Sequence, residues 1–133
     1  MMPLLLRVLG GCAIVIVSFL GTTFLLDYFA PRCPSVAIYP LKPPYPKIGA
    51  GVDYTAAAPS LEAVSDSSPT PVRSTYLMCE NGYRLGPGHS PHVDIAAKGR
   101  GRFSHWGTVF VFSASDNSDP NTNGRAYWAV DVK

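Results

Sequence analysis

An uninterrupted apolar stretch near the start of the chain sets that region apart from everything that follows. Residues 8–26 contain no charged side chain. As a helix they would extend roughly 28 Å, about the thickness of a bilayer hydrocarbon core. Arg7 precedes the stretch, so the positive-inside rule predicts that residues 1–7 are cytoplasmic and that the C-terminal part is extracytoplasmic. The pattern predicts a single-pass signal anchor with its C-terminal part outside the cytoplasm.

Two other interpretations of this apolar stretch remain open. A cleaved signal peptide would have a shorter apolar core and a small-residue cleavage site, whereas here Pro31 directly follows Ala30. A lipoprotein signal would use Cys12, but almost no apolar chain lies between Arg7 and that cysteine. We therefore expect the transmembrane helix to stay attached to the rest of the chain.

Proline dominates the next part of the chain. Nine prolines fall within residues 31–71. Proline lacks an amide donor and fixes φ, which disfavours helices and central strands. We interpret residues 27–71 as a Pro-rich linker that holds a folded domain off the membrane, with a single helical turn near residues 60–65.

Strand-like runs alternate with turn signals from residue 72 to residue 133. Asn81-Gly82 is a strong short hairpin signal, because this dipeptide suits the tight turn between two strands. We predict a mainly β fold, with four or five antiparallel strands in a small sheet or sandwich and no extracytoplasmic helix longer than one turn. The strand-like runs are residues 74–79, 92–97, 108–113 and 125–132.

The run at residues 108–113 is apolar on both of its faces, which predicts a central strand. Such a strand needs cover on both sides, and one short sheet hardly supplies it. Either the preceding linker packs across this strand or another protein chain does.

Composition narrows the function classes. The chain has 133 residues and a formal net charge of only +2, without a long basic run. These values disfavour a multidomain enzyme, a solenoid, a polytopic transporter and a nucleic-acid-binding protein. Once the apolar stretch is set aside, the remaining chain suffices for one small domain.

Two cysteines lie beyond the predicted membrane helix. Cys33 and Cys79 would both face an oxidising compartment, where thiols of small domains commonly pair. We predict a Cys33–Cys79 disulfide, with two free thiols as the alternative.

The polar loop at residues 115–125 resembles the first half of a calcium-binding loop. Asp119, Asn121 and Asn123 are spaced as alternating oxygen ligands would be, and Gly124 follows them. The second half fails, because Val130 occupies the place of the bidentate glutamate. We therefore favour a structural loop in which Gly124 has a left-handed backbone, and keep a calcium site as the alternative.

Residues 113–127 as a whole resemble a strand–loop–strand pattern in extracytoplasmic β-domains of bacterial inner-membrane proteins associated with cell-envelope glycosyltransferase and polysaccharide systems. The resemblance covers a short segment and brings no catalytic residue with it. It implies an accessory β-module without the membrane-embedded enzyme, and it implies that the predicted single-pass anchor lies in the cell inner membrane.

Histidines provide the candidate chemistry for metal binding or hydrolysis. His89, His92, Asp94 and His105 are possible zinc ligands, although exposed loop histidines explain the same pattern. The segment around Ser90 lacks the second glycine of a nucleophile elbow, so a hydrolase remains only an alternative. We predict that the protein is not an enzyme and needs no metal or other cofactor.

Aromatic and basic side chains suggest a binding surface. Tyr83 and Trp106 offer aromatic faces for sugar rings, and Arg100 and Arg102 offer charged donors. We predict that the extracytoplasmic domain binds a partner protein or a neutral or anionic envelope glycan through these four residues. The alternative is an accessory subunit of a larger inner-membrane complex, in which the membrane helix makes the functional contact.

Overall fold

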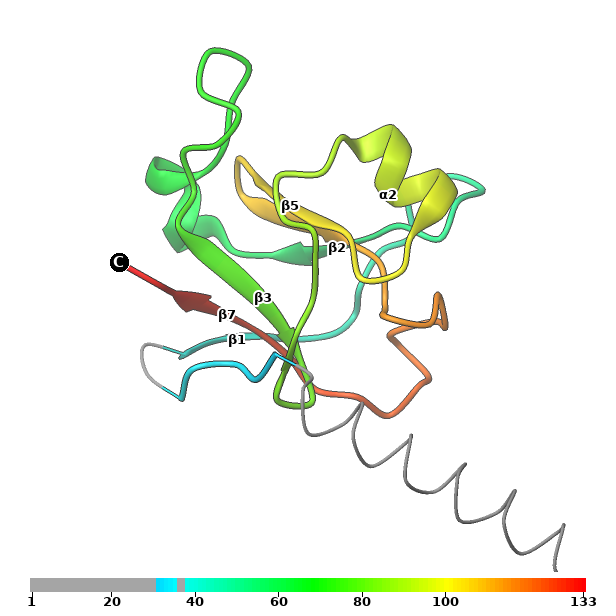
Figure 1. The fold of residues 1–133 in the computed structure, drawn as a ribbon. Coiled ribbons are helices and arrows are strands. Elements are labelled where there is room, and N and C mark those ends of the chain that lie inside the picture. Colours follow the sequence, from blue (N-terminus) through cyan, green and yellow to red (C-terminus); the bar gives the residue numbers. More distant parts are fainter. Residues whose placement is uncertain (1–30, 36–37) are drawn as a thin grey trace, which may run out of the picture. The chain divides into compact units, whose positions relative to one another are not determined.

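Seven strands form two antiparallel sheets in the computed structural model, which describes residues 31–35 and 38–133 (Figure 1). The first sheet has the order β1 (Ile38–Leu41), β7 (Tyr127–Asp131), β3 (Tyr76–Glu80) and β4 (Tyr83–Arg84). The second has the order β2 (Tyr54–Ala57), β6 (Val109–Phe112) and β5 (Phe103–Trp106). The helices are η1 (Pro59–Val64), a 3₁₀ helix, and α2 (His92–Lys98).

The predicted cytoplasmic segment and membrane helix, residues 1–7 and 8–26, lie outside the described residues. None of the helices in the described part of the chain has the length and apolarity that crossing a bilayer requires. The residues from Arg32 to Lys133 form a unit of their own.

The core lies between the two sheets. Met78, Tyr127 and Ala129 from the first sheet belong to the same buried cluster as Phe110 and Phe112 from the second. The rings of Phe112 and Tyr127 lie 5.1 Å apart between their centroids. This packing confirms the mainly β, sandwich-like character of the predicted domain.

The strand β6 is central, as its two apolar faces predict. It pairs with β2 on one side and β5 on the other, and Phe110, Val111 and Phe112 are all buried. Phe110 and Phe112 face the core, whereas α2 packs against β5 and β6 and buries its Ile95. The cover that this strand needs therefore comes from the same chain, on one side from the first sheet and on the other from α2.

The hairpin at Asn81-Gly82 is confirmed. These two residues connect β3 to β4 with φ values of +48° and +92°. A two-residue turn with positive φ at both positions matches the right-handed twist of the flanking strands, and asparagine and glycine tolerate that backbone best.

The interpretation of residues 27–71 as a linker does not hold for residues 38–71, although both strands found there lie at sheet edges and neither is central. This segment contains β1, which pairs with β7, and β2, which pairs with β6. Two of its prolines occupy positions that tolerate a missing amide donor: Pro40 lies in an edge strand and Pro59 in the first turn of η1. The helical turn expected near residues 60–65 is present as η1. The folded unit begins near Arg32 rather than at Val72.

The predicted strand at residues 92–97 is also wrong, because these residues form α2. The prediction of no extracytoplasmic helix longer than one turn is wrong as well, because the seven residues of α2 make about two turns. Ile95 is buried, whereas Val93, which would lie on the same face of a strand, is 72% exposed. Asp94 and Lys98 form an ion pair at 2.9 Å one helical turn apart, and Gly99 ends the helix with φ +56°. Adjacent alanines, the ion pair and the terminal glycine favour the helix over a six-residue strand pattern.

The predicted disulfide is confirmed. Cys33 and Cys79 are bonded, with their Cα atoms 6.2 Å apart. The amide of Cys33 also donates to the carbonyl of Gly82 at 2.8 Å. The segment that enters the domain is thereby held against the β3–β4 hairpin.

Candidate functional site

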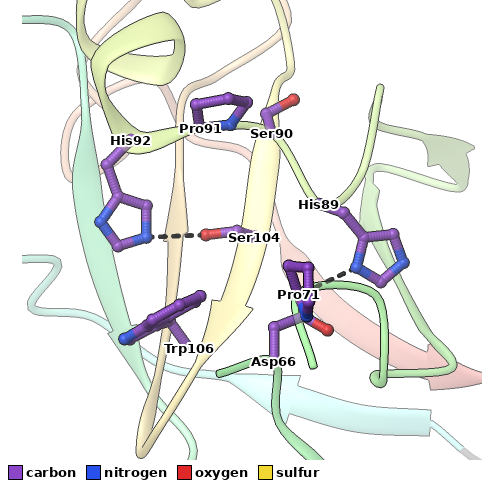
Figure 2. A pocket seen from close by; sticks show the side chains of 8 residues that line it. All are labelled: Asp66, Pro71, His89, Ser90, Pro91, His92, Ser104 and Trp106. Carbon is purple, nitrogen blue, oxygen red and sulfur yellow. Dashed lines mark hydrogen bonds and ion pairs between the residues drawn. The ribbon is translucent and has the colours of Figure 1, made fainter. Parts of the chain in front are cut away.

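A hollow in the described surface lies where α2 begins, beside β5 (Figure 2). It has a volume of about 470 Å³. Trp106 and His92 lie on one side of it, His89 and Asp66 lie on the other, and Ser104 is between them. Its remaining lining residues are Pro71, Ser90 and Pro91. A concave site with a few convergent polar groups is where small ligands usually bind.

Asp66 is the charged centre of this cavity. It is only 2% exposed, and its amide donates to the carbonyl of His105 on β5 at 2.8 Å. Its carboxylate accepts the amide of Ser74 at 2.8 Å and lies 2.7 Å from Nδ1 of His89. Because a carboxylate only accepts, Nδ1 carries a proton, which leaves Nε2 of His89 for another partner.

A second polar pair forms the opposite side of the cavity. Nε2 of His92 lies 2.9 Å from Oγ of Ser104, and the ring of Trp106 meets that of His92 edge-on at 5.7 Å between centroids. Ser104 and Trp106 share one face of β5 because they are two residues apart in a strand. Trp106 is 38% exposed, so much of its ring is open to contact.

His105 points to the other face of β5, into the protein interior. Its ring stacks on Phe110 at 4.3 Å, and its Nδ1 lies 2.8 Å from Oγ of Ser74. Its Nε2 is buried without a hydrogen-bond partner in the described part of the chain. Burial lowers the pKa of His105, since a charged imidazole loses solvation there, although the nearby Asp66 carboxylate opposes this shift.

The four residues considered as zinc ligands do not converge. His89 pairs with Asp66, His92 with Ser104, and Asp94 with Lys98, while His105 faces the core. Among residues 31–35 and 38–133, no group of three or more histidine, cysteine or acidic side chains is placed to hold a metal ion.

The predicted binding residues do not share one patch. Trp106, the last residue of β5, lines the cavity. Arg102 comes directly before the first residue of β5, and its Nη1 donates to the carbonyl of Gly99 at 3.0 Å. Arg100 lies in the turn after α2, where its amide donates to Oδ1 of Asn117. Tyr83 belongs to β4 in the other sheet, beneath the guanidinium of Arg32.

The side chains proposed for calcium instead connect parts of the fold. Asn121 accepts the amide of Tyr45 at 2.8 Å and donates to its carbonyl at 3.0 Å. Asp119 accepts the amide and side chain of Asn121, and Asn123 donates to the hydroxyl of Tyr127 at 2.8 Å. Gly124 has φ +70°, as predicted for the end of this loop. These bonds support the structural interpretation of the loop.

A second hollow, of about 410 Å³, lies beside β1 and the start of β7. Its lining is largely apolar and includes Pro40, Pro43, Tyr45 and Trp128. Arg125 also lines it, but that guanidinium pairs with Asp116 and Glu80. This groove therefore has an apolar lining with few polar groups that could orient a ligand.

Sequence reasoning missed the residues that complete the cavity. Asp66 and Pro71 fall in the stretch interpreted as a linker, and Ser104 had no motif around it. Asp66 and His89 are 23 residues apart in the sequence, and hydrophobic periodicity does not predict a contact between residues so far apart. Trp106 was identified because an aromatic ring beside polar residues is a recognisable signal.

Comparisons with known proteins add no family or homologue. No protein-family model, curated protein or solved structure matches the chain.

Proposed function

We propose that the protein is a membrane-anchored, extracytoplasmic and non-catalytic binding module, and that its ligand is an envelope glycan held in the cavity beside β5. The Cys33–Cys79 disulfide supports an oxidising compartment, and the apolar stretch at residues 8–26 supports a single-pass anchor in the inner membrane.

One observation carries the choice of ligand. An exposed tryptophan ring, Trp106, shares a single cavity with two polar pairs, Asp66–His89 and His92–Ser104. A sugar ring has C–H faces that stack on an aromatic side chain and hydroxyls that both donate and accept hydrogen bonds. Imidazole and hydroxyl groups suit such hydroxyls because they act as donor or acceptor.

The arrangement of these groups favours binding over hydrolysis. A serine hydrolase needs one connected series in which a carboxylate orients the histidine that activates the serine. Here the carboxylate of Asp66 pairs with His89, whereas His92 is the residue bonded to Ser104. Two separate pairs provide hydrogen-bonding positions on both sides of a ligand without forming that series.

The two tryptophans of the chain allow a direct test. Trp106 lies in the cavity and Trp128 in the other sheet, so Trp128→Phe leaves Trp106 as the only indole fluorophore. The full chain is titrated, in a detergent without a sugar headgroup, with trisaccharides of gluco, galacto and manno configuration, with and without N-acetyl groups.

We expect at least one trisaccharide to change the fluorescence of the Trp128→Phe variant. The matched Trp106→Phe variant should keep its Trp128 emission unchanged on titration. Its affinity, measured like that of Trp106→Ala by isothermal titration calorimetry, should be about tenfold lower, because a smaller ring stacks less well. Glycan binding that survives Trp106→Ala, or no binding by any trisaccharide of the panel, would overturn the proposed function.

A further inference from the structure

We infer that the cavity beside β5 binds uncharged sugars in preference to anionic ones, and that the negative charge of the Asp66 carboxylate causes this preference. This inference rests on the proposed function, and it narrows the two glycan classes, neutral and anionic, to one.

The lining of the cavity contains a carboxylate and, among the described residues, no lysine or arginine. Asp66 provides this carboxylate, and no other described acid lines the cavity. The other titratable lining groups are the imidazoles of His89 and His92. With neutral imidazoles the cavity therefore carries one negative charge, and a bound uronate or phosphate would meet repulsion rather than a pairing cation.

Burial makes this charge effective. Asp66 is 2% exposed, so water screens its carboxylate poorly toward a ligand that fills the cavity. The two arginines predicted to bind an anionic glycan, Arg100 and Arg102, do not line the cavity. Arg102 comes directly before β5, at the end of the strand away from Trp106, and its guanidinium donates a hydrogen bond to the carbonyl of Gly99.

Asp66→Asn removes the charge while keeping the geometry. The asparagine Oδ1 still accepts the amide of Ser74, and its Nδ2 donates to Nδ1 of His89, which then carries its proton on Nε2. A sugar hydroxyl adapts to either form of that imidazole, because it donates as well as it accepts. Affinities for the charged and uncharged form of one sugar are therefore compared within each variant, so that a change in overall affinity caused by Asp66→Asn cancels.

Uronic acids supply matched ligands. Trisaccharides of galacturonic, glucuronic and mannuronic acid are each used as the free carboxylate and as the methyl ester, so that the two forms differ mainly in charge. Binding is measured by the fluorescence of Trp106 in the full chain at pH 8 and low ionic strength, above the ordinary titration range of imidazole. Glu80→Gln is the control, because Glu80 is also a buried acid but lies outside the cavity.

We expect the methyl esters to bind about tenfold more tightly than the carboxylates in the parent and in Glu80→Gln, and about equally in Asp66→Asn. Equal or tighter binding of the carboxylates by the parent chain would overturn the inference and leave the proposed function intact. A preference for esters that survives in Asp66→Asn would overturn the role of Asp66. If neither these ligands nor the neutral trisaccharides bind, the proposed function itself fails.

Discussion

Breaking the Cys33–Cys79 disulfide should remove about 4 kcal/mol of stability from the domain. The bond joins residues 46 positions apart and closes a loop that contains β1, β2 and η1. In the chain-entropy model, a cross-link over a loop of this length restricts the unfolded chain by about 4 kcal/mol at 25 °C. For a domain of about 100 residues this is a fall in Tm on the order of 15 °C or more.

Cys33→Ser is the best single change for this test. Cys33 is half-buried, whereas Cys79 is fully buried in β3, where a serine hydroxyl would add a desolvation cost of its own. Urea unfolding of the full chain, followed by tryptophan emission, gives the free energy of unfolding. Treating the parent chain with a thiol reductant should produce the same loss as Cys33→Ser, and the reductant should leave the variant unchanged.

A loss below about 1 kcal/mol in Cys33→Ser would refute the reasoning, because a loop of 46 positions cannot contribute so little if it is free in the unfolded state. A loss that appears in Cys33→Ser and not on reduction would point to native contacts of that side chain instead. The entropic account requires the two treatments to agree.

Three further outcomes follow from the fold. Residues 72–133 alone should stay unfolded by circular dichroism, whereas Arg32–Lys133 should fold, because β1 and β2 supply one partner each for β7 and β6. Asn121→Ala should lower the free energy of unfolding by about 2 kcal/mol in urea, through the loss of two hydrogen bonds to the backbone of Tyr45, and a loss near zero would show that the loop does not brace the fold. Because burial lowers the pKa of His105 in the folded state, the unfolded chain binds a proton more readily, and stability should be lost as pH falls below the unfolded value of about 6.5. Thermal melts at pH 7.5 and 5 should show this loss in the parent chain and a smaller one in His105→Phe.

Local chemistry made part of this architecture predictable. Asn81-Gly82 specifies a hairpin because few other dipeptides adopt two positive φ angles without strain. The strand β6 could be recognised as central because a run with two apolar faces is stable in the fold only when both faces are covered from water. Each of these signals comes from a few adjacent residues and is independent of the rest of the fold.

Short segments with competing signals were decided by their surroundings. Residues 92–97 alternate like a strand, yet the α2 conformation buries Ile95 against the second sheet and pairs Asp94 with Lys98. The Pro-rich segment carried signals against central strands, and it forms β1 at a sheet edge, where a proline costs no ladder hydrogen bond.

By itself the sequence predicted the mainly β class, the disulfide and Trp106 as a candidate binding residue. Only the tertiary structure brought Asp66, from the Pro-rich segment, to His89, and Ser104 of β5 to His92 at the start of α2. The physical reason is the sequence separation over which each kind of interaction acts. Propensity, turn chemistry and hydrophobic alternation act between residues a few positions apart, whereas the cavity depends on strand pairing and sheet packing between distant segments, and those depend on the free energy of the whole domain.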